Sequence, residues 1–266
     1  MTAPAIVLCA WLLFGGTHLI LGLPPLRDYL ARRLGDQPFV AMFSAIAAVT
    51  LGLIAAAVAM FGGEGPAGAW LGRLPVARVL LATLSFLGLT LAIAGLMNYM
   101  RSPMALFRTK LHPPIGIERI TRHAFFMGLT LFAAAHALLA PTLAICIYFA
   151  GFAVLATAGA LLQDRKLLAR HGAPYASYLA ATSVIPFVAL LQRRQTITGE
   201  DRLLRRFALS GAIALLLLAA HPLWSAFHGA PFAGVMAAGG IFASARRWWH
   251  ARAADALARR PANSAP

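Results

Sequence analysis

Long apolar stretches separated by short polar segments dominate the sequence. Apolar stretches of roughly 18 or more residues are typical of transmembrane helices. Such stretches, the last of them shorter, cover residues 5–23, 39–61, 79–97, 123–140, 142–162, 207–227 and 230–245. The chain lacks the alternating segments of about ten residues that a membrane β-barrel requires, and lipid permits only helices or closed barrels. The pattern therefore predicts an all-α fold, a polytopic transmembrane bundle of about six or seven helices.

The spacing of the stretches adds detail to this prediction. Only Pro141 separates the fourth stretch from the fifth, which predicts a tight helical hairpin. Residues 183–191 are apolar but too short to span a bilayer, so we expect them at the membrane interface or in a re-entrant segment. Residues 230–245 are marginal in length, and the C-terminal tail lies on the basic side of the membrane only if that run spans.

Composition and charge agree with a membrane protein. The 266 residues are 60% hydrophobic and 12% charged, with a mean hydropathy of +0.75, whereas soluble domains are about 45–50% apolar and about 25% charged. A net charge of +15 on a soluble protein would suggest nucleic acid. Here 21 of the 23 lysines and arginines fall in the tail and the loops of one side. The positive-inside rule places that side in the cytoplasm and the N-terminus outside. We therefore expect membrane lipid, and no nucleic acid, as a partner.

Histidines are the main candidates for chemistry inside the apolar runs. His18, His136 and His221 lie within such runs, and His123 stands at the cytoplasmic start of the fourth. An ionisable group at membrane depth is a functional-site hypothesis, and imidazole is a common metal ligand. The alternative is that each histidine only forms hydrogen bonds between helices. On a regular helix, His123 and His136 are about 220° and about 20 Å apart, so they cannot share one small site. By depth, His18 matches His123 and His221 matches His136.

The surroundings of His18 allow two interpretations. Gly15 and Gly22 lie three residues before and four residues after it, so all three share one helix face. Small residues on that face leave room for a flat group beside the imidazole. They also allow ordinary close packing against another helix.

Two polar clusters fall on the side that we expect to be cytoplasmic. In residues 115–123, a helix would place Arg119 four residues before His123 and Glu118 four residues before Arg122. Guanidinium groups and an imidazole at a helix start suit a carboxylate or phosphate group, although a basic turn that only sets topology is the alternative. The other cluster is residues 163–172 with Tyr175 and Tyr178, and we expect it to close over the first.

These clusters carry a resemblance to the NnrU family. The segment Gly116–His123, the Phe125–Gly128 and His136 regions, and Gln163–Arg165 with Gly172, Tyr175 and Tyr178 all resemble that family, as do the early His18 and the late His221-Pro222. The resemblance covers roughly residues 5 to 235. It implies a transmembrane domain at residues 1–235, followed by a marginal last span and a basic cytoplasmic or interfacial tail at residues 236–266.

The family resemblance implies a bacterial inner-membrane protein associated by name with nitrite and nitric oxide reduction in denitrification. A plant and cyanobacterial relative, 15-cis-ζ-carotene isomerase, uses a membrane-embedded haem b held by histidine. Carried over by position, His18 and His123 are the favoured ligands, with His136 and His221 behind them. The cofactor-binding candidates around them are the arginines and tyrosines of the two clusters. We add the inference that the arginines pair with haem propionates, a charge-assisted contact. These candidates are Arg119, Arg122, Arg165, Tyr175 and Tyr178.

The same clusters resemble, more distantly, the isoprenylcysteine carboxyl methyltransferases and phospholipid methyltransferases, which bind S-adenosylmethionine between two such segments. This chain departs from their pattern at Ala124, Phe126 and Gln163-Asp164. The changes remove a tyrosine hydroxyl and a carboxylate, so they put methyl transfer in doubt.

Three hypotheses follow from the sequence. The first is an NnrU-type membrane protein that binds haem b and has an isomerase-like or nitrogen-oxide-related role, acting on a hydrophobic small molecule in the isomerase case. The second is an S-adenosylmethionine-dependent membrane methyltransferase, and the third is a cofactor-free accessory protein. The sequence leaves open the substrate, the oligomeric state and whether the protein is an enzyme.

Overall fold

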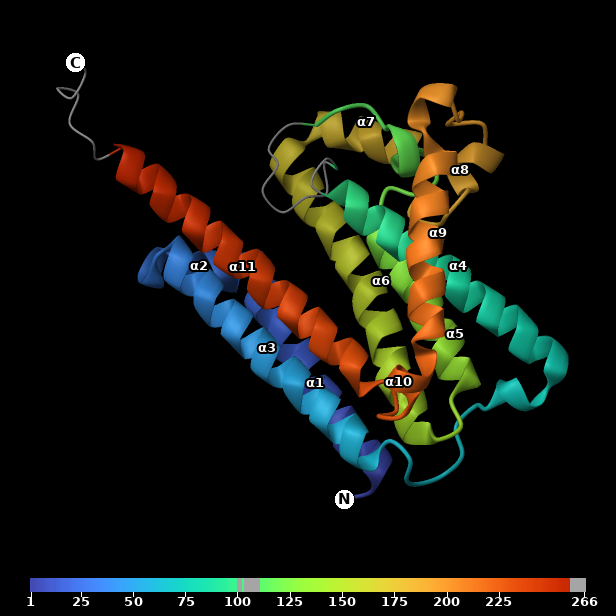
Figure 1. The fold of residues 1–266 in the computed structure, drawn as a ribbon. Helices are drawn as coiled ribbons and strands as arrows, with labels where there is room; N and C mark the ends of the chain where they lie inside the picture. The colour runs from blue at the N-terminus through green and yellow to red at the C-terminus, as the bar shows by residue number, and fades with distance from the viewer. Residues whose placement is uncertain (100–101, 103–110, 259–266) are drawn as a thin grey trace, which may run out of the picture. The chain divides into compact units, whose positions relative to one another are not determined.

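The computed structural model describes residues 1–99, 102 and 111–258, and every regular element within them is helical. This confirms the all-α prediction. The elements are α1 (Ala3–Gly22), α2 (Pro24–Leu34), α3 (Asp36–Phe61), η1 (Leu71–Arg73), α4 (Pro75–Tyr99), η2 (Gly116–Arg119), α5 (Ala124–Leu139), α6 (Leu143–His171), α7 (Ala173–Ala181), α8 (Val188–Leu191), η3 (Gly199–Asp201), α9 (Leu203–Ala219), α10 (His221–Ser225) and α11 (Ala230–Ala258) (Figure 1).

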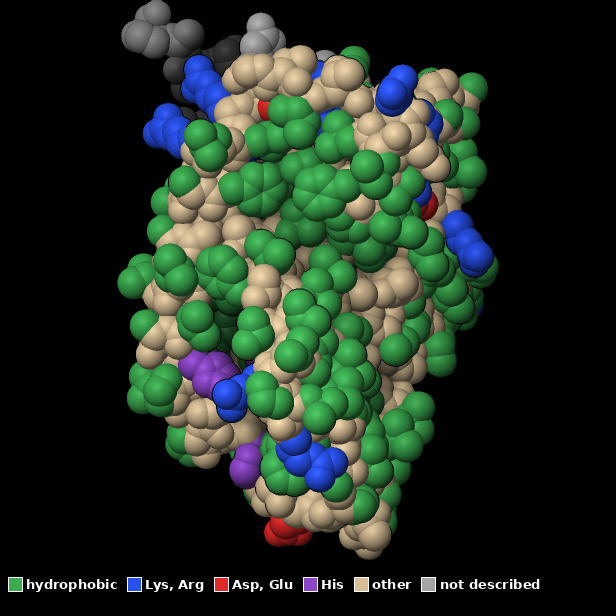
Figure 2. Space-filling model, turned by 90° about the vertical axis from the view of Figure 1, so that its right-hand side faces the viewer, with side chains coloured by type: hydrophobic (Ala, Val, Ile, Leu, Met, Phe, Trp, Pro, Cys, Tyr) green, Lys and Arg blue, Asp and Glu red, His purple; other side chains and the backbone are tan. Residues whose placement is uncertain are grey.

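Among the described residues, four helices are long and apolar enough to cross a membrane: α1, α3, α4 and α6. Helix α5 and the first part of α11 are shorter apolar helices. Large hydrophobic side chains on these helices stand exposed, with Leu80 at 64% and Leu87 at 56%. On the face in Figure 2, hydrophobic side chains cover most of the surface and charged ones are sparse. Such a surface suits lipid and not water, so the chain is an integral membrane protein.

The chain forms two compact units. The first contains residues 1–64 and 223–266, in which α1 and α11 both pack along α3 (Figure 1). The Ser44 and Ser244 hydroxyls form a 2.6 Å hydrogen bond between α3 and α11. Helix α11 runs without a break across residue 235, where the sequence predicted the boundary between a domain and a tail. The chain beyond residue 258 lies outside the described residues, so the predicted character of the tail stays a prediction.

The second unit, residues 65–222, is built on α4, α5 and α6, with α9 against α4. Helices α5 and α6 form the predicted hairpin, joined by three residues. The segment before η1 is held to that turn, because the backbone amides of Gly68 and Trp70 donate to the carbonyls of Pro141 and Ala140 at 3.0 Å. At the opposite end of these helices, α7 and α8 pack across the polar ends (Figure 1).

Helices α4 and α5 approach each other through small residues. A Cβ atom on Gly128 would meet the backbone of Gly88 and Ala92, and one on Gly95 would meet the backbone of Ala124 and Phe125. Lipid supplies no hydrophobic force between helices, so close backbone packing has to hold them together. Hydrogen bonds add to it. Ser85 on α4 contacts His136 Nδ1 on α5 at 3.0 Å, and the Thr130 and Thr157 hydroxyls make a 3.1 Å contact between α5 and α6.

Two helices differ from the predicted stretches. Helix α6 continues to His171, nine residues past the predicted end at 162, because a helix that leaves the lipid can carry charged residues without a desolvation cost. The stretch at 207–227 was predicted as one span, and it is divided: α9 ends at Ala219 and α10 begins at His221. Pro222 lacks the amide that would continue the helix, which explains the break.

We predict that Gly128→Ala destabilises the protein by about 1–3 kcal/mol, because the added methyl group meets the α4 backbone, which cannot yield like a side chain. Gly211→Ala on α9 is the matched control, since its Cβ atom would meet only Thr90 Cγ2, at 4.0 Å. It should change stability by less than about 1 kcal/mol. Thermal unfolding in detergent measures both variants. Equal effects of the two substitutions would show that the α4–α5 contact is looser than described.

Candidate functional site

The predicted polar clusters meet at one end of the second unit. The sequence pattern predicted that residues 115–123 open the helix that follows α4, and the structure shows that they do not. Residues 116–119 form η2, a turn follows, and α5 begins only at Ala124, with His123 at its N-cap position in a non-helical conformation. The predicted four-residue pairings of Arg119 with His123 and of Glu118 with Arg122 are therefore wrong. The chain turns at residues 120–122 instead, where the Arg122 amide donates to the Ser183 carbonyl and His123 is non-helical.

Residues 183–187 hold this irregular turn in place. The Arg122 amide donates to the Ser183 carbonyl at 3.0 Å, and the Thr121 hydroxyl donates to the Val184 carbonyl at 2.5 Å. The Phe187 amide donates to the Ile120 carbonyl at 2.9 Å. The short apolar piece that the sequence placed at the interface does not span. It supplies the acceptor of the Arg122 amide, while the Ile120 and Thr121 amides donate to the Ile117 carbonyl within the turn.

Asp164 is the centre of the site. Its Oδ2 accepts from Arg122 Nε and Nη2 at 3.0 and 2.8 Å, and its Oδ1 lies 2.7 Å from His123 Nε2. The Tyr175 hydroxyl donates to Oδ1 at 2.7 Å. The carboxylate is only 8% exposed, so its charge has to be compensated by these partners, and a bidentate guanidinium is the strongest of them.

Local sequence explains why these groups meet. The polar extension of α6 carries Asp164 to the end of the apolar bundle. Gly172, with φ +59°, then reverses the chain so that α7 packs back against α6. Tyr175 and Tyr178, three residues apart on α7, stack with ring centroids 5.8 Å apart and point their hydroxyls at different carboxyl groups.

The second carboxyl group is Glu118, which is 2% exposed. It accepts from the Tyr178 hydroxyl at 3.2 Å and from Asn98 Nδ2 and the Ile115 amide at 3.4 Å each. The nearby Arg206 guanidinium donates to Asn98 Oδ1 at 2.8 Å. Burial raises the pKa of the Glu118 carboxyl, and the His112 imidazole 3.8 Å away only partly opposes that shift. Burial and the same carboxyl raise the pKa of Tyr178 as well.

A third carboxyl, Asp201, ties η3 to the start of η2. It accepts from the amides of Gly116 and Thr198 at 2.7 and 2.8 Å, and Arg119 Nε lies 3.3 Å from it. Burial alone would raise the pKa of Asp201, but these amides and the guanidinium together lower it. The role of this contact is structural, because it closes the segment before α9 onto the turn.

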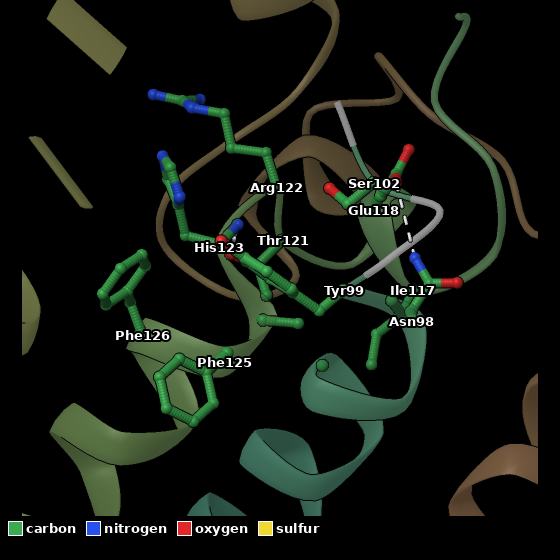
Figure 3. Close-up of a pocket in the computed structure, with 12 residues that line it drawn as sticks. Asn98, Tyr99, Ser102, Ile117, Glu118, Thr121, Arg122, His123, Phe125 and Phe126 are labelled. Carbon is green, nitrogen blue, oxygen red and sulfur yellow. Dashed lines mark hydrogen bonds between the residues drawn. The ribbon is translucent and has the colours of Figure 1, made fainter. Parts of the chain in front are cut away.

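A pocket that is partly open to the outside lies beside Glu118, and Arg122 and His123, which are both bound to Asp164, line it as well. Its apolar lining includes Ile117, Phe125 and Phe126. Figure 3 shows Arg122 and His123 projecting on one side of it, while Glu118, Ser102 and Asn98 group on the other. A mostly apolar pocket with a few polar groups is the usual form of a ligand site.

The structure brings four predicted site residues to Asp164 and Glu118: Arg122 and His123, which also line the pocket, and Tyr175 and Tyr178, which donate to these carboxyl groups. Arg119 lies apart from them, paired with Asp201 and the Thr196 carbonyl, and Arg165 is exposed. The polar cluster of residues 163–172 with Tyr175 and Tyr178 closes over the cluster of residues 115–123, as predicted.

The other candidate histidines lie elsewhere. His136 contacts Ser85 and the rings of Phe132 and Phe149, and His221 begins α10. His18 belongs to the first unit and packs against Phe14 and Phe43, with open space beside Gly15. Because His18 and His123 lie in different units, their pairing stays a prediction. Within the described part of the chain, no group of three or more His, Cys, Asp or Glu residues is placed to hold a metal ion.

Sequence reasoning did not select Asp164, Glu118 or Asn98 as site residues. Their signal was available, because each is a polar residue within one or two residues of the predicted end of an apolar stretch or inside a polar cluster. What the sequence lacked was the fold of residues 116–123, which decides which carboxyl faces which partner.

Comparison with known proteins settles the family. The sequence model of the family described as NnrU protein matches residues 6–229, which is most of the chain. The protein belongs to the NnrU family. Among curated proteins, the 15-cis-ζ-carotene isomerase of Arabidopsis thaliana is 28% identical over 67% of this chain and 49% of its own length. The Zea mays enzyme of the same name is 31% identical over 46% of this chain and 34% of its own length. The chain thus spans about half or less of these relatives, and no solved structure matches it.

We predict that Asp164→Asn lowers the free energy of unfolding of this NnrU protein by about 3 kcal/mol, because it leaves the Arg122 guanidinium buried without its counter-charge. Asp28→Asn, which breaks an ion pair whose side chains are 41% and 53% exposed, is the control and should cost no more than about 0.5 kcal/mol. Denaturation in detergent measures both. A loss for Asp164→Asn no larger than the control would contradict the central role of the carboxylate.

We also predict a pH dependence that Glu118→Gln removes. The folded pKa of Glu118 is above its ordinary value of 4.5, so the native state holds this proton more tightly than the unfolded state. Its contribution to stability is full below pH 4.5 and is lost as the pH rises through the folded pKa. The stability of Glu118→Gln relative to wild type should therefore increase over that window. Glu64→Gln, at an exposed carboxyl, should show no such trend. A constant difference between Glu118→Gln and wild type would overturn the assignment.

Proposed function

We propose that this NnrU protein is a membrane-embedded isomerase of a lipid-soluble conjugated polyene, and that it works with haem b bound through histidine. The reaction class comes from the names of the relatives, 15-cis-ζ-carotene isomerases. A membrane-spanning bundle whose pocket has an apolar wall suits a substrate that is dissolved in lipid.

The geometry of His123 is the main support for the cofactor. Its side chain is fully buried, its Nε2 is held by Asp164 at 2.7 Å, and its Nδ1 has no hydrogen-bond partner among the described residues. Histidines that bind metals usually donate their other ring N–H to a carboxylate, which fixes the ring and leaves one nitrogen for the metal. The residues present therefore fit an iron ligand at Nδ1 of His123.

Each neighbouring residue has a definite task in this proposal. Asp164 fixes the tautomer and orientation of the imidazole, while Arg122 and Tyr175 keep that carboxylate ionised and in place. Phe125 and Phe126 give the pocket an apolar wall that limits water and accepts a polyene chain. When bound, haem b supplies an iron that can give and take back an electron, and isomerisation needs no net gain or loss of atoms or electrons.

The structure changes which of the three predicted arginines is free to contact a haem propionate. Arg122 and Arg119 are engaged with Asp164 and Asp201, so a propionate would compete with ion pairs that already exist. Arg165 is exposed at the same end of α6 and would compete with no such pair among the described contacts. We therefore favour Arg165 as the propionate partner.

The rival hypotheses find less support. S-adenosylmethionine needs polar partners, yet Arg122, His123 and Tyr175 are hydrogen-bonded to Asp164, and Tyr178 to Glu118. The cofactor-free accessory role is supported at one position, because His136 contacts Ser85 as a histidine that only links helices would. We also propose that the protein lies in a bacterial inner membrane with its N-terminus outside, so that the His123 end faces the cytoplasm.

The first test is the absorption spectrum of the full chain purified in mild detergent, oxidised and dithionite-reduced, with a pyridine haemochrome assay. We expect near-stoichiometric haem b in the wild type and its loss in His123→Ala. Asp164→Asn should weaken haem binding by about 10–100-fold, because it removes the partner that orients the ligand. His171→Ala, at the end of α6, is the matched control and should keep full haem content. His18→Ala tests the second favoured ligand separately.

Activity is then tested with 15-cis-ζ-carotene in nanodiscs containing the haem-loaded protein, with isomers separated by chromatography. Conversion that disappears in His123→Ala would support the isomerase. A protein without haem after reconstitution sinks the cofactor proposal and makes S-adenosylmethionine binding the next assay. A haem protein that binds nitric oxide but leaves polyenes unchanged would point to the nitrogen-oxide role.

A further inference from the structure

Residues 185–205, here called the α8–α9 surface, carry exposed hydrophobic side chains close to arginines. The segment runs between α7 and the first turn of α9, at the same end of the second unit as the site (Figure 1). Its exposed large hydrophobic residues are Ile185, Phe187, Leu191, Ile197 and Leu204. Leu191 and Leu204 are the most exposed, at 80% and 86%. Apolar side chains so exposed at the polar end of a membrane bundle suit the boundary between lipid headgroups and acyl chains. The proposed function gives this surface no task.

The same surface is basic. Residues 192–206 contain five arginines and two acidic residues. Three of the arginines are exposed, and no contact in the described part of the chain engages their guanidinium groups: Arg193, Arg202 and Arg205. Asp201 does not neutralise them, because its carboxylate accepts from two backbone amides and lies 3.3 Å from Arg119. The surface therefore presents positive charge that the described contacts leave available to a partner.

Contacts with the rest of the unit hold the α8–α9 surface in shape. Arg119 Nη1 donates to the Thr196 carbonyl at 2.7 Å and its Nε faces Asp201, so two parts of the surface meet at one guanidinium. Arg194 Nη1 donates to two carbonyls at the C-terminal end of α7, at 2.6 Å each. A surface that is ordered before it binds loses less conformational entropy on binding, so these contacts favour a recognition role.

Charge and apolar exposure together restrict the partner. A soluble anion would pair with the arginines but leave Leu191 and Leu204 in water, and a neutral lipid would cover the leucines but give the guanidinium groups no counter-charge. An anionic phospholipid meets both requirements, because its phosphate accepts from arginine in a bidentate manner and its acyl chains cover the leucines. Exposed leucines of α9, Leu209, Leu215 and Leu216, continue the apolar surface from the arginines along the helix.

We propose that the α8–α9 surface binds the headgroup of an anionic phospholipid. The three exposed arginines pair with its phosphate, and Leu191 and Leu204 enter the acyl layer beside it. The positive-inside rule needs only the number of basic residues on one side of the membrane, whereas this proposal assigns binding to particular side chains. The surface lies outside the residues that the isomerase proposal uses, so the two proposals are independent.

The test is lipid binding by the full chain in mild detergent, followed by native mass spectrometry. Dioleoyl phosphatidylglycerol and dioleoyl phosphatidylcholine have the same acyl chains and differ in headgroup charge. Each arginine near an anionic lipid contributes about fivefold in affinity, so we expect the first phosphatidylglycerol to bind about 100-fold more tightly than phosphatidylcholine. In the double variant Arg202→Gln with Arg205→Gln the preference should fall to about fivefold, with the Kd of phosphatidylcholine unchanged.

Two further variants locate the effect. Arg73→Gln with Arg78→Gln removes the same charge at the opposite end of the second unit, where Arg73 stacks on the Trp70 ring at 4.8 Å, and should keep the preference of the wild type. Leu191→Ser with Leu204→Ser should weaken both lipids alike, because contact with acyl chains does not distinguish headgroups. These side chains are exposed, so the substitutions leave the fold intact.

Equal Kd values for the two lipids in the wild type overturn the proposal without any variant. An undiminished preference in the Arg202 and Arg205 variant also overturns it, and so does an equal loss in the Arg73 and Arg78 control, which would show unspecific charge attraction. Glycerophosphoglycerol, the headgroup without acyl chains, should bind far more weakly than the lipid. If it binds as tightly, a soluble anion replaces the lipid as the partner.

Discussion

The buried carboxylate of Asp164 is the constraint on which this end of the protein depends. A charge with 8% exposure is stable only with partners in good geometry, and the chain supplies them from the turn before α5 and from α7. The turn before α5 and helix α7 are thereby both fixed to the end of α6. The position of His123 follows from that requirement, because the same carboxylate that neutralises Arg122 also holds the imidazole.

In the apolar parts of α4 and α5, contact with lipid sets a different constraint. In lipid, burying apolar surface between helices contributes no hydrophobic free energy. Helices α4 and α5 are therefore joined by close backbone contact at Gly88, Gly95 and Gly128 and by the polar pair of Ser85 and His136. The rigid crossing sets where Asn98 and His123 emerge from the apolar layer. The pocket therefore lies at the transition between the apolar and polar parts, and both the rings of Phe125 and Phe126 and the polar groups of Glu118, Arg122 and His123 line it.

The two inner carboxyl groups differ by environment and not by residue type alone. Asp164 accepts short hydrogen bonds from a guanidinium, whereas the described hydrogen bonds of Glu118 are longer, and burial raises its pKa. In the NnrU protein this difference separates a carboxylate that positions a histidine from a carboxyl that holds its proton more tightly.

The sequence by itself determined the fold class and the α5–α6 hairpin, because long apolar stretches in lipid have to form helices, and its motifs indicated the family. It also predicted Arg122, His123, Tyr175 and Tyr178 as site residues; the structure brings them together, and their role stays a prediction. It predicted the wrong geometry for residues 115–123, where a helical spacing was assumed and the chain turns before α5. It passed over Asp164 and Glu118, and it placed Arg119 beside His123 although that side chain pairs with Asp201. Only the tertiary structure decided these points, because the partner of a buried charge depends on which loops close over it, and sequence spacing carries no information across such a closure.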